Sequence, residues 1–163
     1  MVNSVEARQR AYTAVAAVTD PELPMLTIAD LGILRDVTMS GERVEVTITP
    51  TYSGCPAMNM IALEIDLALA QAGFADSSIR TVLAPAWTTD FLTPAGREKL
   101  LAHGIAPPAR VGGRRALFGE TPVACPRCAS GDTELLAEFG STACKSLYRC
   151  RACREPFDAF KCH

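Results

Sequence analysis

CPRCASGDTELLAEFGSTACKSLYRCRAC, residues 125–153, decides the fold of the C-terminal part of this chain of 163 residues. The stretch opens with a CxxC pair, Cys125 and Cys128, and closes with a second pair, Cys150 and Cys153. Each CxxC turn lets two thiolates converge on one ion, and four thiolates complete the closed tetrahedral site of structural zinc. A segment this small cannot fold on a hydrophobic core alone, so metal binding would supply its folding energy. We therefore predict a zinc β-ribbon over residues 123–163 that holds one structural Zn2+.

The 21 residues between the two cysteine pairs predict a β-hairpin. LLAEF (135–139) and SLYRC (146–150) suit its two strands. Cys144 and Cys162 lie in the same part of the chain, where they could be additional ligands, ligands of a second centre, or spare thiols. Because six cysteines fall within the last 39 residues, an iron–sulfur cluster stays open as the alternative to zinc.

The segment upstream of the ribbon has the composition of a linker. GIAPPARVGGRRALFGETP (104–122) is rich in Gly, Pro and Arg. We predict a linker over residues 105–122 and a separate domain over residues 1–104.

The expected first domain is of the α+β class. Apolar spacing and cap residues predict three helices. The first ends near Asp20, the second spans residues 57–72, and the third begins after Thr93. Alternating apolar and polar residues predict three strands, over 33–39, 44–49 and 79–84. The order α-β-β-α-β-α places helices on one side of a small mixed sheet.

The remaining cysteine, Cys55, lies in TPTYSGCPAM (49–58), where the second strand gives way to the long helix. With Pro56 in the first helical position, Cys55 falls at or near the N-cap, where free N–H groups favour a thiolate. This placement predicts a lowered pKa and suits binding of iron or of a cluster, or thiol exchange. A small buried residue that packs the start of the helix is the equally weighted alternative.

Acidic residues occur in two loops that could approach Cys55. Asp20 and Glu22 begin DPELPMLTIADLG (20–32), and Asp90 follows the third predicted strand. One interpretation is a metal-handling pocket around Cys55. From the pattern alone, turn and cap chemistry is the commoner role for such residues.

Bulk properties exclude several classes of function. The formal charge is −2 and the pI about 5.7, so no strong positive field favours nucleic acid. No apolar run approaches bilayer length and the N-terminus lacks a signal-peptide pattern, so a cytoplasmic protein without membrane contact is expected. A reducing compartment favours metal ligation over disulfides. Dinucleotide, P-loop and hydrolase motifs are absent from the sequence.

Together these motifs carry a family resemblance. DPELPMLTIADLGI (20–33), TPTYSGCPAM (49–58), PAWTTDFLTPAGREKL (85–100) and the closing cysteine segment resemble the PaaD family, the D subunits of bacterial phenylacetyl-CoA epoxidase systems. The first domain resembles the SufT-like iron–sulfur assembly family, through Asp20-Pro21-Glu22 and Cys55-Pro56. Phe91 stands where relatives often carry another bulky residue, a departure of little weight.

The resemblance implies an accessory role in aerobic phenylacetate catabolism and no catalysis by the chain itself. Expected partners are the oxygenase and reductase subunits of the epoxidase and the iron–sulfur assembly machinery. The expected task is to assemble or maintain an iron–sulfur or di-iron centre of a partner, with Cys55, Asp20, Glu22 and Asp90 as site residues and a transient iron–sulfur cluster as cargo. The alternative is a non-catalytic docking subunit of the oxygenase. Small mixed sheets commonly dimerise, so a homodimer is among the expected states.

Overall fold

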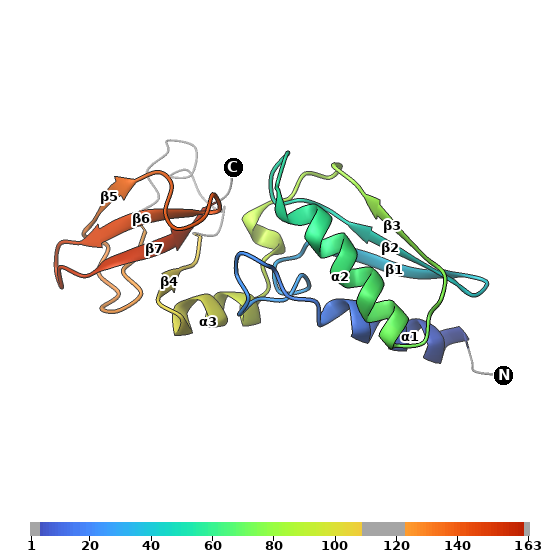
Figure 1. Ribbon diagram of the computed structural model, residues 1–163. Coiled ribbons are helices and arrows are strands. Elements are labelled where there is room, and N and C mark those ends of the chain that lie inside the picture. Colours follow the sequence, from blue (N-terminus) through green and yellow to red (C-terminus); the bar gives the residue numbers. More distant parts are fainter. Residues whose placement is uncertain (1–3, 109–122, 162–163) are drawn as a thin grey trace. The chain divides into compact units, whose positions relative to one another are not determined.

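The computed structural model describes residues 4–108 and 123–161. The chain forms two compact units, Met1–Trp87 and Thr88–His163. Figure 1 shows their elements in sequence colours. None of the helices within the described ranges combines the length and the apolar content needed to cross a lipid bilayer.

The first unit contains two of the three helices and all three strands predicted for the first domain: α1 (Ser4–Ala16), β1 (Leu34–Ser40), β2 (Arg43–Ile48), α2 (Ala57–Gln71) and β3 (Ser77–Thr81). β1 and β2 form an antiparallel hairpin, and β3 runs parallel to β2, which gives the sheet order β1-β2-β3. Gly41, with φ of 65°, supplies the turn of the hairpin. The predicted mixed sheet of an α+β fold is therefore confirmed.

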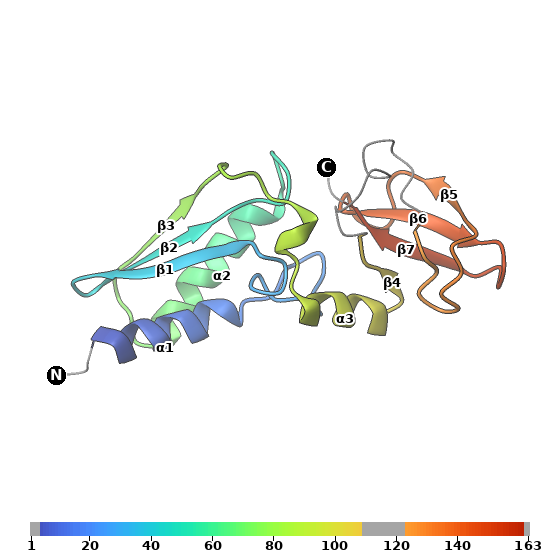
Figure 2. The ribbon, with the colours of Figure 1, turned by 180° about the vertical axis from the view of Figure 1, so that it is seen from behind.

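Helix α2 provides the main core face of this unit. Ile61, Ile65 and Leu69 recur at helical spacing and are fully buried. They face the sheet, whose Val44, Val46 and Ile48 on β2 are also buried. Seen from the two opposite directions of Figure 1 and Figure 2, α2 lies on one face of the β1–β3 sheet. Gly73 adopts φ of +87° just beyond the helix, as expected of its stop residue.

The loop between α1 and β1 is packed and not merely a connection. Leu23, Leu26 and Ile28 are at most 1% exposed, so the loop contributes to the same core. The indole Nε1 of Trp87 donates a buried hydrogen bond of 2.7 Å to the carbonyl oxygen of Leu31. This bond holds the segment after β3 against the loop.

The second unit contains α3 (Pro94–Ala102), a 3-10 turn (Thr89–Phe91), β4 (Ile105–Ala106), β5 (Thr133–Ala137), β6 (Lys145–Cys150) and β7 (Pro156–Phe160). The predicted hairpin is confirmed as the antiparallel pair β5–β6. β7 adds to β6 and β4 adds to β7, which gives a sheet of order β4-β7-β6-β5. The predicted cap of α3 is present, because Thr93 Oγ1 accepts a hydrogen bond from the N–H of Gly96.

Two features of the second unit differ from expectation. Ile105 and Ala106, expected as the start of a linker, form β4 and are buried because they pair with Asp158 and Ala159 of β7. Helix α3, expected in the first domain, belongs to the second compact unit. The rest of the expected linker, residues 109–122, lies outside the described residues, and the boundaries 1–104, 105–122 and 123–163 remain predictions.

Candidate metal centre and candidate thiol site

The two CxxC pairs meet in the second unit. The sulfur atoms of Cys125, Cys128, Cys150 and Cys153 all lie within 4.8 Å of one another. Cys125 and Cys128 precede β5, whereas Cys150 ends β6 and Cys153 lies in the turn before β7. Pairing of β5 with β6 sets Thr133 opposite Cys150, and this brings the two turns together. Among the described residues, no other group of three or more His, Cys, Asp or Glu side chains converges in this way.

The sulfur spacing fits ligation of one ion. Cys125 Sγ lies 3.7 Å from Cys153 Sγ, and Cys128 Sγ lies 3.5 Å from Cys150 Sγ. Four sulfurs at about 2.3 Å from a tetrahedral centre would be separated by about 3.8 Å. In an iron–sulfur cluster the four thiolates are distributed over two or more iron atoms, so the four sulfurs as a group must stand farther apart. The donor set and its spacing therefore suit a single tetrahedral ion, with zinc as the metal that four thiolates prefer in a structural site.

The backbone of the turns prepares these thiols for ligation. The N–H of Cys153 donates to Cys150 Sγ over 3.5 Å, and this bond lowers the pKa of Cys150 to about 7. For Cys153, a bond from the N–H of Glu155 is outweighed by desolvation and by the adjacent thiols, which raise the pKa to about 12. Metal binding would release the protons that these thiols hold.

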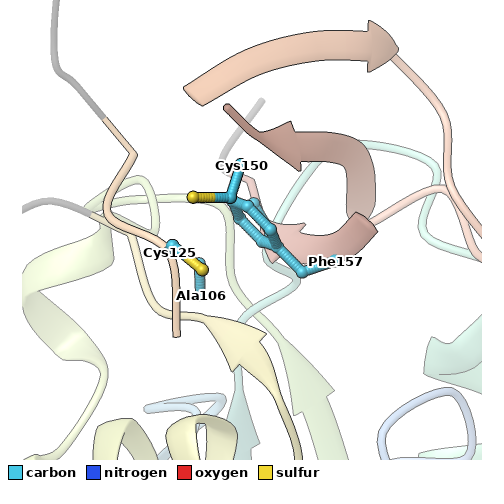
Figure 3. Packing of buried hydrophobic residues seen from close by; sticks show 5 residues of the cluster. Ala106, Cys125, Cys150 and Phe157 are labelled. Carbon is cyan, nitrogen blue, oxygen red and sulfur yellow. The ribbon is translucent and has the colours of Figure 1, made fainter. Parts of the chain in front are cut away.

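Two of the ligands also belong to the core of the second unit. Cys125 and Cys150 are at most 2% exposed and cluster with Ala106, Phe157 and Ala159. Figure 3 shows Cys125 beside Ala106 and Cys150 beside the ring of Phe157. Two of the four candidate metal ligands are therefore also core residues of the second unit.

Cys144 is not one of the converging ligands. It is buried, its Sγ lies 3.1 Å from Thr142 Oγ1, and its carbonyl oxygen accepts from the N–H of Lys161. Of the possibilities named for Cys144, an additional ligand of the same ion is not supported, because its sulfur is not in the four-sulfur group. Cys162, the other candidate, lies outside the described residues.

Cys55 lies where the sequence placed it, in the turn before α2. Pro56 is the N-cap residue, and Cys55 is the half-buried residue before it. The N–H of Cys55 donates to the carbonyl oxygen of Tyr52 over 3.3 Å, which closes the turn. Gly54 adopts φ of +83°, a conformation that favours glycine, so the turn depends on this residue.

The expected lowering of the Cys55 pKa was wrong. Burial raises the pKa of this thiol, and the negative charges of Glu22 and Asp20 raise it further. A hydrogen bond from the N–H of Ala57 and one from Tyr52 act in the opposite direction but do not compensate. The prediction counted the helix N-terminus but omitted the burial of the thiol and the two carboxylates that the fold brings near the sulfur. A raised pKa favours the protonated form of this thiol at neutral pH.

The electrostatic coupling of Asp20 and Glu22 to Cys55 brings these three predicted residues into one neighbourhood of the first unit. Asp20 is 7% exposed, and its Oδ1 accepts from the N–H groups of Glu22 and Leu23 at 2.8 and 2.9 Å. Desolvation nevertheless raises the pKa of Asp20. The carboxylate therefore performs the turn chemistry that was the alternative interpretation, and its charge also reaches the thiol.

Two further residues, Asp90 and Tyr52, differ in their relation to Cys55. Asp90 is exposed in the 3-10 turn of the second unit, so its membership of a pocket around Cys55 remains a prediction. The sequence reasoning missed Tyr52, which hydrogen-bonds Cys55. Its position three residues before the cysteine, in the same glycine-containing turn, was the available signal.

Comparisons with known proteins match both parts of the chain. Residues 8–79 match the family model described as iron-sulfur cluster assembly protein, and residues 111–161 match the model described as PaaD zinc beta ribbon domain. The first match runs from within α1 to within β3 and includes Cys55, and the second covers all four converging cysteines.

Individual proteins agree with these matches. The chain is 37% identical over 94 residues to the Fe-S protein maturation auxiliary factor YitW of Bacillus subtilis, which covers 56% of this chain and 88% of that protein. A crystal structure of a domain of unknown function, DUF59, from Bacillus anthracis superposes with a TM-score of 0.56 at 25% identity, over 60% of this chain and 93% of that one.

A relative of nearly full length settles the family. The chain is 51% identical over 151 residues to the putative D subunit of the 1,2-phenylacetyl-CoA epoxidase of Escherichia coli, and the match covers 93% of this chain and 90% of that protein. With its iron–sulfur assembly domain followed by a four-cysteine zinc ribbon, the chain belongs to the PaaD family of phenylacetyl-CoA epoxidase D subunits.

Proposed function

We propose that this chain is an accessory factor of a multi-subunit phenylacetyl-CoA epoxidase, and that it assembles or maintains an iron–sulfur or di-iron centre of a partner subunit. Cys55 is the thiol that transiently holds iron or a cluster. The observation that carries this proposal is the half-buried thiol of Cys55, set before α2 and within electrostatic reach of Asp20 and Glu22.

The comparisons support the accessory role. The matched first-domain model is described by iron–sulfur cluster assembly, the Bacillus subtilis relative is named a maturation factor, and the Escherichia coli relative is named an epoxidase subunit. The oxygenase and reductase subunits and the general iron–sulfur assembly machinery are the proposed partners. The proposed place of action is the cytoplasm.

The chemistry around Cys55 suits a transient load. A protonated, half-buried thiol beside two carboxylates is a poor nucleophile at neutral pH. A bound iron cation would displace the thiol proton, and Asp20 and Glu22 would then stabilise the positive charge of the metal, although as bare anions they oppose the thiolate. The three groups do not form a preformed ligand set in the described structure, since only the four ribbon cysteines converge. Weak, exchangeable binding is what a transfer site requires.

The ribbon has a different task in this proposal. Cys125, Cys128, Cys150 and Cys153 would hold one Zn2+ permanently, because their spacing is closed around a single ion. The bound ion supplies folding energy and no redox chemistry.

Replacement of Cys55 tests the proposal. Cells that produce the epoxidase together with Cys55→Ser should yield partner subunits with less iron and sulfide per chain, measured on protein purified without oxygen. Ser53→Ala is the matched control, because Ser53 is an exposed residue of the same turn. Partner subunits with full iron and sulfide content in the Cys55→Ser strain would remove Cys55 from the mechanism.

The edge of the ribbon favours a second candidate function, a non-catalytic docking role within the oxygenase complex. Leu135 and Leu136 on the edge strand β5 are 50% and 48% exposed, and Phe139 just beyond it is 61% exposed. Edge strands with exposed apolar residues are common docking sites for partner chains. Leu135→Ser together with Phe139→Ser would then abolish co-purification with the oxygenase, while Cys55→Ser would leave both co-purification and iron content unchanged.

A further inference from the structure

Helix α2 exposes large apolar residues on the face that points away from its own core. Met60, Leu63 and Leu67 are 48%, 53% and 48% exposed. The opposite face of the same helix is fully buried through Ile61, Ile65 and Leu69. A helix that is apolar on both faces is normally covered on both. In Figure 1, α2 lies in front of its sheet, and no element of the first unit lies over it.

The spacing of these residues is that of a helix-pairing seam. Met60, Leu63 and Leu67 stand at i, i+3 and i+7, which aligns them in one narrow stripe along the helix. Glu64 and Asp66 border the stripe, one on each side. They are the only charged residues of α2, which contains no Lys or Arg. The surface is therefore an apolar strip between two negative borders.

We infer that this strip docks an amphipathic helix of a partner protein, whose own apolar stripe is bordered by Lys or Arg. Basic borders would pair with Glu64 and Asp66, and the apolar stripe would cover Met60, Leu63 and Leu67. The inference concerns an interaction surface and does not depend on the role of Cys55.

A second copy of this chain fits the strip less well. In a contact of α2 with α2 of a second copy, the helix offers no basic residue to the neighbour's Glu64 or Asp66. Neither carboxylate would then gain an ion-pair partner, and Asp66 would keep only the hydrogen bond of 2.6 Å that its Oδ1 accepts from Ser77 Oγ. Three half-exposed side chains also fall far short of the roughly 800 Å² per partner that a standard stable interface buries. The size of the strip suits a transient contact with one helix.

The test uses the full, metal-loaded chain and two labelled synthetic peptides. Each peptide has about 18 residues, because shorter isolated helices are marginal in water. Both carry the same leucine stripe, bordered by lysine in one peptide and by glutamate in the other. Fluorescence anisotropy should show binding of the lysine peptide, weakened by added salt, and at least about tenfold weaker binding of the glutamate peptide.

Variants of the protein locate the contact. Leu63→Gln with Leu67→Gln should weaken binding of the lysine peptide at least about tenfold, as expected for the loss of two anchors. Leu83→Gln is the matched control, since Leu83 is a 67% exposed leucine outside α2 and its replacement should leave affinity unchanged. Glu64→Lys should shift preference toward the glutamate peptide. Circular dichroism verifies that each variant is folded.

Several results would overturn the inference. Equal affinity for both peptides, absence of binding, or equal loss in the Leu83→Gln control would show that the strip does not select a basic helix. Sedimentation that detects a dimer of the wild type, lost in Leu63→Gln with Leu67→Gln, would assign the strip to a second copy. Iron content of partner subunits is a separate measurement, so these outcomes are distinguishable from failure of the proposed function.

Discussion

The two compact units bury their centres with different chemistry. In the first unit the centre is aliphatic, with Ile61, Ile65 and Leu69 of α2 fully buried against the β1–β3 sheet. In the second unit, the cluster at the metal centre contains two of the four ligand cysteines beside one aromatic ring and two alanines. The first unit has an apolar centre that can drive its folding, whereas for this part of the second unit we expect folding to depend on ligation of the thiols.

The largest expected effect comes from removing the metal. Cys125→Ser with Cys150→Ser, or exhaustive chelation, should unfold the ribbon, because structural zinc supplies on the order of 10 kcal/mol in small modules. Elemental analysis should find no bound zinc. NMR should show lost dispersion for residues of β4 to β7, since β4 pairs with β7, while the first unit keeps its dispersion. Cys144→Ala, which lies outside the sulfur group, should retain the metal. If the ribbon resonances stay dispersed after chelation, the ribbon does not need a metal to fold, and the proposed difference between the two units is wrong.

The converse change belongs to the first unit. Ile61→Ala should lower the free energy of unfolding of that unit by about 2–5 kcal/mol, because it opens a cavity under α2. Denaturant melts followed by circular dichroism measure the loss, and zinc content should remain at one per chain. Leu63→Ala, on the exposed side of the same helix, should change stability by less than about 0.5 kcal/mol. A loss of zinc in Ile61→Ala would mean that the units do not fold independently.

A smaller effect tests whether local helix chemistry also contributes to the second unit. Thr93→Ala removes the side-chain bond to the N–H of Gly96 and should cost about 1 kcal/mol. Thermal unfolding of the zinc-loaded protein measures the cost, and Thr93→Ser should retain most of the stability since serine caps equally well. If Thr93→Ala and wild type unfold at the same temperature, the side-chain cap does not contribute to the stability of α3.

The smallest expected effect concerns the Cys55 thiol of the first unit. The raised pKa of Cys55 means that alkylation should be slow at neutral pH and should accelerate as pH rises above 9, the ordinary value of the thiol. Glu22→Gln removes one opposing charge and should increase the rate at pH 8, measured by mass spectrometry of the Cys55 peptide. Folding stability should fall as pH rises past this range, because the folded state holds the proton more tightly than the unfolded chain.

The same alkylation experiment tests whether Glu22 influences the reactivity of the Cys55 thiol. Glu45→Gln, at an exposed position of β2, controls for a general change in net charge. Equal rates for Glu22→Gln and wild type would show that the carboxylate does not influence the thiol. A thiol that reacts rapidly at pH 7 would restore the prediction of a lowered pKa.

Helices, strands and the metal ligands were largely accessible from sequence because each depends on local spacing. Thr93 caps α3 and Gly73 ends α2, both as predicted. β7 was missed because Pro156–Phe160 is short and starts with proline, a residue tolerated at the first position of a strand. β4 has only two residues and exists through its pairing with β7.

Sequence alone determined that two CxxC turns near the carboxyl terminus would hold one ion, because the spacing within each turn is a local property of the backbone. It also determined the mixed sheet, through the alternation of β1 and β2 and the period of α2. Only the tertiary structure decided the direction of the Cys55 pKa shift. The pKa is raised first by burial and then by the charges of Glu22 and Asp20, which are more than thirty residues away in the chain and become neighbours by folding. Charge interactions act through space, and a sequence pattern records only distance along the chain.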